Sequence, residues 1–298
     1  MEGARPIPEE GATGGAGPSA PAGPARATIG TAATSGTTDS AATPLLEVRG
    51  LSKSFRGLQA LQDYELRLAP LAIHGVIGPN GAGKTTLFHV LSGFLRPTSG
   101  TIMFEGRNIT GLPAHRVSQL GMGRTFQNIR LFGELSVLDN VKVGLERHAR
   151  PSFFGTLLSS PSFQRTERDL DTRARELLDL FGLGRHADRQ ARNLAYGDQR
   201  RLEIARAVGT QPKLLLLDEP NAGMNPIETQ ELLGLIRRLR DQLGITVVLV
   251  AHDIPLVMNL CDRIQVLNYG RLIAEGDPAS VRSNPDVISA YIGQARHG

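Results

Sequence analysis

The most informative stretch of this 298-residue sequence is Gly78-Pro79-Asn80-Gly81-Ala82-Gly83-Lys84-Thr85. It matches the pattern G-x-x-x-x-G-K-[ST] in full, and it lies between an apolar run over residues 72–77 and a helical pattern that starts at Thr86. Glycines let backbone N–H groups curl around phosphate oxygens, and the N-terminus of the next helix adds its dipole. We therefore expect residues Gly78 to Thr86 to bind a nucleoside triphosphate, with Lys84 on the β- and γ-phosphates and Thr85 on Mg²⁺.

Two acidic residues follow a second apolar run. Four leucines at 214–217 lead directly into Asp218 and Glu219, and the carboxyl end of a strand is where α/β sheets place their ligands. Asp218 is expected to hold Mg²⁺ through water, and Glu219 to orient or deprotonate the attacking water. Together with the phosphate-binding loop, this pair predicts hydrolysis of the bound nucleotide.

Apolar runs alternate with helical patterns from Leu45 onward, which predicts an α/β core around a largely parallel sheet with an antiparallel edge. One apolar stripe at helical spacing covers residues 227–243. Residues of roughly 130–196 lack strand-like runs and predict a helical subdomain. The expected strands cover residues 46–48, 64–68, 72–77, 101–104, 214–217, 246–250 and 264–267.

Composition limits the remaining possibilities. The 33 Lys and Arg residues against 29 Asp and Glu give a formal charge of +4 that is spread thinly, so we expect no nucleic-acid partner. The single cysteine, Cys261, excludes an intramolecular disulfide. The sequence contains no run of 18 apolar residues, so we expect no segment that spans a membrane. Residues 1–44 are mostly Gly, Ala, Pro, Ser and Thr and are expected to be disordered, which leaves a domain at 45–293 and a tail at 294–298.

Taken together, these motifs resemble the ATP-binding subunits of ABC transporters. The resemblance implies a P-loop NTPase fold with a mixed-sheet core, an antiparallel β edge and an α-helical subdomain. It also implies that Gln127, in Arg124-Thr125-Phe126-Gln127, contacts Mg²⁺ and water and senses the membrane subunit. His252 would stabilise the γ-phosphate in the transition state, and Phe55 would stack on adenine.

The family signature, usually Leu-Ser-Gly-Gly-Gln, reads here Leu194-Ala195-Tyr196-Gly197-Asp198. In the family it presses on the γ-phosphate of ATP held by the opposite subunit, so the resemblance implies a dimer with ATP between its subunits. Ala195 offers no hydroxyl and Asp198 brings a negative charge. The Gly197 N–H and the helix N-terminus are then the remaining donors.

Four further segments resemble the ATPases of branched-chain amino-acid importers: residues 124–132, 151–165, 194–206 and 284–293. The segment at 151–165 is an aromatic insertion that either docks a permease or packs the helical subdomain. The resemblance covers about residues 45–293. It implies a second, homologous ATPase as the partner in a heterodimer, two permease subunits and an extracytoplasmic substrate-binding protein. The chain would be peripheral, on the cytoplasmic face of the membrane.

Several alternatives stay open. Within ABC transport they are uptake of urea, amides or other amino acids, and lipopolysaccharide export. A non-transport ABC ATPase acting on ribosomes or in DNA repair is disfavoured by the single cassette, and by the lack of a coiled-coil insertion and of a zinc-type cysteine cluster. A small-molecule kinase would have no use for the signature or for His252.

Overall fold

The computed structural model describes residues 43–146 and 161–292, with side chains from 167 in the second range up to 291. The expected disordered extension, apart from its last two residues, lies outside these ranges, as do the C-terminal tail and most of the insertion at 151–165. Among the described helices, none combines the length and the apolar character that crossing a membrane requires.

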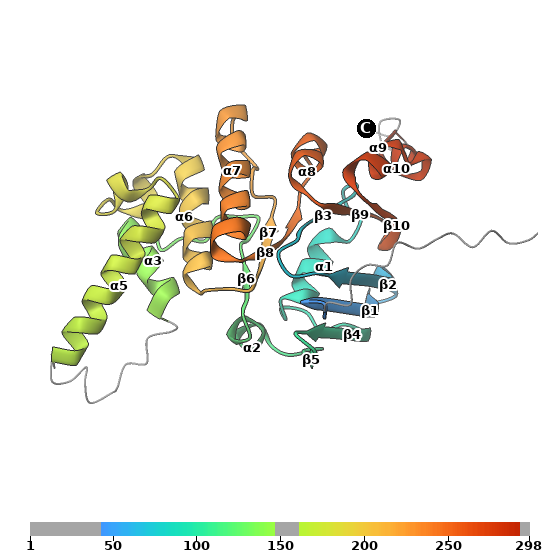
Figure 1. Ribbon diagram of the computed structural model, residues 1–298. Coiled ribbons are helices and arrows are strands. Elements are labelled where there is room, and N and C mark those ends of the chain that lie inside the picture. The colour runs from blue at the N-terminus through green and yellow to red at the C-terminus, as the bar shows by residue number, and fades with distance from the viewer. Residues whose placement is uncertain (1–42, 147–160, 293–298) are drawn as a thin grey trace, which may run out of the picture. The chain divides into compact units, whose positions relative to one another are not determined.

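A six-stranded mixed sheet forms the centre of the fold, in the order β10-β9-β3-β8-β7-β6 (Figure 1). Strands β9, β3, β8, β7 and β6 run parallel, and β10 pairs antiparallel with β9. Every residue of β3, β7 and β8 is buried, because helices or a second sheet cover both faces. The strands are β3 (Ile73–Ile77), β6 (Met122–Arg124), β7 (Leu214–Asp218), β8 (Thr246–Val250), β9 (Arg263–Asn268) and β10 (Arg271–Gly276).

The strands β1, β2, β4 and β5 form a separate antiparallel sheet, in the order β2-β1-β4-β5, whereas the antiparallel strand β10 extends the edge of the central sheet. The apolar side chains of the separate sheet share one core cluster with helix α1 and with one face of the central strands, including Val76 and Leu216. The expected α/β fold with antiparallel strands is therefore confirmed, with these strands stacked on α1. The elements are β1 (Leu46–Phe55), β2 (Leu58–Leu68), α1 (Lys84–Leu91), β4 (Ser99–Phe104), β5 (Arg107–Asn108) and α2 (Ala114–Gln119).

Helices cover the opposite face of the central sheet. Leu215, Leu217 and Leu249 point into a second core cluster that includes α7, α8 and the helices that precede β7 in the chain. Between residues 130 and 196 the described segments hold helices and one isolated bridge, Ser136 to Gln190. These helices are α3 (Val137–Leu145), α5 (Pro161–Leu180), two 3₁₀ turns (Gly184–His186 and Ala191–Asn193), α6 (Tyr196–Gly209), α7 (Pro226–Leu243) and α8 (Ile254–Leu260), followed near the C-terminus by α9 (Pro278–Ser283) and α10 (Pro285–Ile292).

Candidate functional site

The loop between β3 and α1 forms a cradle around the Lys84 ammonium group. Gly83 has a φ of 105°, and a Cβ there would lie 2.5 Å from the Ala60 carbonyl oxygen, so only glycine fits. Lys84 Nζ donates to the carbonyl oxygens of Gly78, at 2.6 Å, and Pro79, at 2.9 Å. Burial lowers the pKa of Lys84, while Glu219 and Asp218 oppose that shift. The Lys84 ammonium group thus lies inside the loop, bonded to two of the loop's own carbonyl oxygens.

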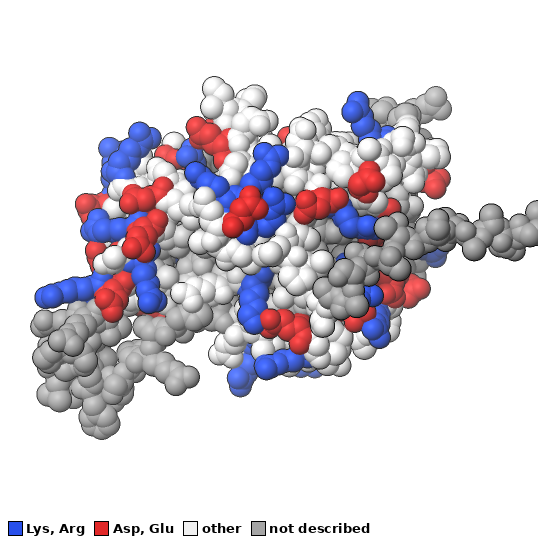
Figure 2. Space-filling view, viewed as in Figure 1, with Lys and Arg blue, Asp and Glu red and all other residues white. Residues whose placement is uncertain are grey.

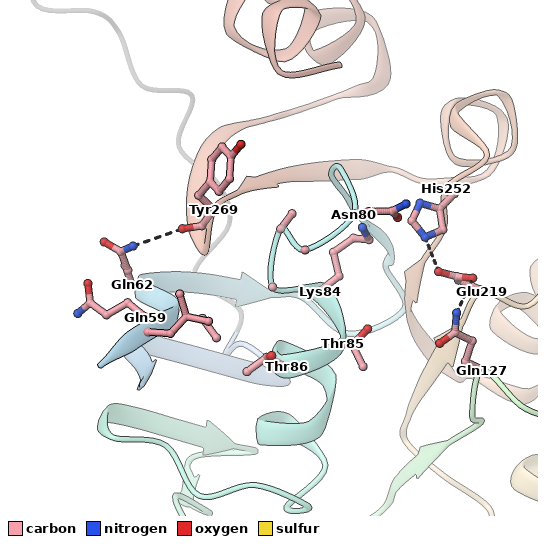
Figure 3. A pocket seen from close by; sticks show the side chains of 15 residues that line it. Gln59, Gln62, Asn80, Lys84, Thr85, Thr86, Gln127, Glu219, His252 and Tyr269 are labelled. Atoms are coloured by element: carbon pink, nitrogen blue, oxygen red, sulfur yellow. Dashed lines mark hydrogen bonds and ion pairs between the residues drawn. The ribbon is translucent and has the colours of Figure 1, made fainter. Parts of the chain in front are cut away.

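A cavity of about 520 Å³ opens over this loop (Figure 3). It brings together groups that follow three neighbouring parallel strands: the loop after β3, Glu219 after β7 and His252 after β8. Gln127 enters from the segment after β6. The cavity is lined by Leu58, Gln59, Ala60, Gln62, Asn80, Gly81, Ala82, Gly83, Lys84, Thr85, Thr86, Gln127, Glu219, His252 and Tyr269.

Two neighbours hold the Glu219 carboxylate, one on each oxygen. His252 Nε2 lies 2.5 Å from Oε1, and Gln127 Nε2 donates to Oε2 at 3.1 Å. Glu219 has a φ of 47°, in the left-handed region, and its N–H donates to the Val250 carbonyl oxygen at 2.9 Å. Left-handed backbone at a non-glycine residue is strained and is concentrated at functional sites. The geometry therefore suits an acid–base group held in one orientation.

Asp218 is buried beside Glu219 and pairs with a cation that sequence reasoning did not assign to it. Arg124 donates from one Nη to Asp218 Oδ2 at 3.0 Å and from the other to Ser92 Oγ at 2.8 Å. Its guanidinium also lies 5.2–5.8 Å from the centroids of three phenylalanine rings, within the range of cation–π attraction. No sequence motif indicates this pair, because 94 residues separate its members. The three rings belong to Phe88, Phe94 and Phe126.

The polar side chains around the loop suit Mg²⁺ bound together with a nucleotide better than a metal ion that only protein side chains hold. Among the described residues, no group of three or more His, Cys, Asp or Glu side chains could enclose a metal ion. Mg²⁺ is usually held by one or two carboxylates together with substrate phosphates and water. The Asp218 carboxylate is not among the residues that line the cavity, but it acts on the Lys84 charge and is a carboxylate of the kind that Mg²⁺ prefers.

The signature residues do not reach this cavity. The segment Leu194 to Asp198 lies at the N-terminus of α6, and none of its members is among the lining residues. Asp198 is instead held by Arg201, at 3.5 Å, and by His186, at 3.8 Å. The negative charge that replaces glutamine in the signature is thus partly offset from within the same chain.

Phe55 is 41% exposed and does not line the cavity, and the Lys53 ammonium group lies 4.9 Å from its ring centroid. The turn between β9 and β10 does line the cavity, and sequence reasoning missed it. Gly270 N–H donates to the Ala82 carbonyl oxygen at 2.9 Å, and Gln62 donates to the Tyr269 carbonyl oxygen at 3.3 Å. Gln62 and Tyr269 are 207 residues apart, so no local pattern indicates the contact.

Sequence comparison supports the assignment that these motifs suggest. A family model described as ABC transporter matches residues 61–222, which include the phosphate-binding loop, Gln127, the signature and Glu219. The chain belongs to the ABC transporter ATP-binding family. A second model, described as branched-chain amino acid ATP-binding cassette transporter, matches residues 271–297 of this ABC cassette.

Curated relatives match the cassette over most of their length. The high-affinity branched-chain amino acid transport ATP-binding protein LivG of Escherichia coli K12 is 50% identical over 252 residues, which are 85% of this chain and 99% of that protein. BraF of Pseudomonas aeruginosa, with the same description, is 47% identical over the same shares. The lipopolysaccharide export ATP-binding protein LptB of Acidithiobacillus ferridurans is 36% identical over 84% of this chain and 97% of that protein.

Solved structures agree on the fold. A nucleotide-free ATP-binding cassette from an ABC transporter has a TM-score of 0.72 and 30% identity, and covers 83% of this chain and 98% of its own. The ADP conformation of an ABC transporter cassette gives the same score and identity, over 84% and 99%. This cassette therefore belongs to a nucleotide-binding family with ATPase activity.

Proposed function

We propose that this chain is the ATP-binding and ATP-hydrolysing subunit of an importer for branched-chain amino acids. The observation that carries the proposal is the 50% identity to LivG over 85% of the chain. The match at 271–297 supports it, because β10, α9 and α10 do not line the nucleotide cavity. The likeness thus extends beyond the residues that ATP hydrolysis itself requires.

The cavity supports a specific chemistry. Backbone N–H groups of residues 80–86 bind the phosphates, and Lys84 exchanges its two loop carbonyls for β- and γ-phosphate oxygens. Glu219 accepts a proton from the attacking water, while Gln127 and His252, already bonded to its carboxylate, orient it and stabilise the charge on the γ-phosphate.

Thr85, Asp218 and Gln127 would hold Mg²⁺, which when bound supplies positive charge to the phosphate oxygens. Arg124 keeps one oxygen of Asp218 occupied. The other oxygen is left for the water through which Asp218 would contact the metal.

A second subunit completes the site. Leu194, Ala195, Tyr196, Gly197 and Asp198 would contact the γ-phosphate held by a homologous ATPase, in a heterodimer. This placement agrees with their position outside the cavity of their own chain. The Gly197 N–H at the start of α6 donates a hydrogen bond to the anion, and Phe55, which is exposed, stacks on adenine.

The remaining partners are two permease subunits and an extracytoplasmic substrate-binding protein, with this chain peripheral on the cytoplasmic face of the membrane. A nucleic-acid partner is disfavoured by the charge pattern, since Figure 2 shows Lys and Arg intermixed with Asp and Glu on the visible face. Lipopolysaccharide export is the alternative, favoured by the 36% identity to LptB. The higher identity to LivG and BraF favours import.

Uptake of labelled leucine in the native host tests the proposal, with the wild-type gene compared with Lys84→Ala. The variant removes the charge on the phosphates and is expected to abolish uptake. Isoleucine and valine should compete with leucine in the wild type, and urea should not. Unchanged uptake in the Lys84→Ala strain, or competition by urea, would contradict the assignment.

A further inference from the structure

A buried ion pair on α6 contacts the loop that carries Gln127. Arg200 and Glu203 are 0% and 1% exposed, and Arg200 is the largest of the fully buried side chains in the described part of the chain. Their charged groups meet at 2.8 Å, between one Arg200 Nη and Glu203 Oε2. Neither residue lines the nucleotide cavity, so the pair has no direct part in the chemistry above.

Arg200 and Glu203 also form hydrogen bonds with the backbone of a segment that is neither helix nor strand. This segment, residues 125–131, is called here the Gln127 loop. Arg200 donates to the carbonyl oxygens of Phe126 and Gln127, both at 2.7 Å. Glu203 Oε1 accepts from the N–H groups of Phe126, at 3.4 Å, and Arg130, at 3.3 Å. The backbone on both sides of Gln127 is therefore held by two side chains of α6.

Stability alone is a poor reason for such a pair. Burial raises the pKa of Glu203, and Arg200 and the two loop amides oppose that shift. The free energy needed to desolvate two charges is often as large as the free energy gained from their attraction. Apolar residues of similar volume can therefore stabilise a fold equally well. What apolar residues could not do is bond to two carbonyl oxygens and two N–H groups of a loop.

The same helix begins with the signature. Gly197 lies three residues before Arg200, which is about 4.5 Å along a helix axis. At the other end of the connection, the Gln127 side chain donates to Glu219 in the nucleotide cavity. One helix thus links the Gln127 backbone to a segment that lies outside the cavity.

We propose that Arg200 and Glu203 are positioning residues that make the Gln127 loop and the signature segment (Leu194 to Asp198) one rigid unit. When nucleotide enters the site of this subunit and displaces Gln127, the signature segment of the same subunit then moves with it. Because the signature would serve the nucleotide of the partner subunit, the pair couples the two ATP sites. This last step rests on the proposed function.

The double variant Arg200→Met/Glu203→Leu tests the coupling, because it removes the charges together and leaves neither one buried alone. In the isolated full-length chain, amide hydrogen exchange across the Gln127 loop should become faster, while affinity for a fluorescent ATP analogue stays within about twofold since the phosphate-binding loop is untouched. In the assembled transporter, kcat should fall roughly 10- to 100-fold, as for a displaced catalytic group.

Asn140→Leu is the matched control. Asn140 is fully buried. Its Oδ1 accepts from the Phe132 N–H and its Nδ2 donates to the Phe132 carbonyl oxygen, so it fixes the chain just beyond the Gln127 loop. Its variant should keep the wild-type exchange rate in that loop and the wild-type kcat. If the double variant fails to fold, Arg200→Lys replaces it, because a lysine keeps the charge but cannot bridge two carbonyls as a planar guanidinium does.

Unchanged exchange in the Gln127 loop, or a kcat within twofold of the control, would overturn the coupling. Those outcomes are distinct from failure of the proposed function. A wild-type transporter that does not hydrolyse ATP would refute the proposed function, and with it the coupling of two ATP sites. A wild-type transporter that does hydrolyse ATP, beside an equally active double variant, would refute the coupling alone.

Discussion

Arg124 neutralises a carboxylate from which water is almost excluded. The side chains of Arg124 and Asp218 are 5% and 3% exposed, and no other cation within the described segments forms an ion pair with Asp218. Burial lowers the pKa of Arg124, whereas Asp218 raises it, so the carboxylate offsets part of the cost of burying the guanidinium. Removing one partner leaves the other as an unpaired buried charge.

Arg124→Met is therefore expected to lower the free energy of unfolding by about 3 kcal/mol, the usual cost of breaking a buried pair. Urea unfolding of the full-length chain measures this loss. Arg240→Met is the control, since Arg240 pairs with Asp241 and Asp262, two carboxylates that are about half exposed, and pairs of that kind contribute under about 1 kcal/mol. Equal losses in the two variants would contradict a special role for the buried pair.

His74 adds a pH-dependent contribution to stability. It is 2% exposed and its Nε2 has no hydrogen-bond partner in the described part of the structure. Burial lowers the pKa of His74 to about 4, against about 6.5 in an unfolded chain. The unfolded state thus binds a proton first as the pH falls, so stability is intact above pH 6.5 and is lost between pH 6.5 and 4.

The loss from this one group is about 3 kcal/mol. This loss is measured by comparing the change in unfolding free energy between pH 7 and pH 4.5 in the wild type with the same change in His74→Gln. The variant should lose less stability on acidification than the wild type. Parallel pH dependence would show that His74 is not held neutral by burial.

At the scale of elements, helix α7 shows how local sequence sets a boundary. Asn225 Oδ1 accepts from the Glu228 N–H, and Glu228 Oε2 accepts from the Asn225 N–H, both at 2.9 Å. Pro226 occupies the first turn, and Gly244, with a φ of 67°, ends the helix. These are the signals that begin and end a helix in sequence, and they agree with the apolar stripe expected over 227–243.

Asn225→Ala should cost about 1 kcal/mol of unfolding free energy, because it removes the acceptor for the Glu228 N–H. Asn225→Asp keeps a side-chain oxygen in the same place and should cost much less. Thermal or urea unfolding of the isolated chain distinguishes the two. If aspartate were as destabilising as alanine, the cap would not be the source of the stability.

The elements that sequence reasoning missed share a physical cause. Continuous apolar runs predicted β3, β7 and β8 because burial on both faces demands apolar residues throughout. Strand β6 spans only Met122–Arg124, and β10 is partly exposed at the sheet edge, so neither carries that pattern. Helix α1 begins at Lys84 rather than Thr86, because its first turn is also the end of the phosphate-binding loop.

At the scale of the whole molecule, the order of the strands assembles the site. The phosphate-binding loop, His252 and Glu219 follow β3, β8 and β7, which are consecutive in the sheet, so motifs far apart in sequence meet at one edge. The motifs and the strand pattern predicted a site at this edge for the phosphate-binding loop and Glu219, whereas His252 was assigned through the family resemblance. The pairing of Arg124 with Asp218 and the contact of the Tyr269 turn with the phosphate-binding loop depend on packing between segments that carry no shared local signal.

The most direct test of an ATPase that drives amino-acid import is hydrolysis by the transporter reconstituted in lipid vesicles, with wild type compared with Glu219→Gln. The variant keeps the size of the side chain but loses the basic carboxylate. We predict that leucine-loaded binding protein stimulates hydrolysis in the wild type, and that Glu219→Gln binds ATP but remains in an ATP-bound dimer without turnover. Wild-type turnover by Glu219→Gln would remove Glu219 from its role as the base, and a wild-type rate indifferent to leucine would contradict the importer.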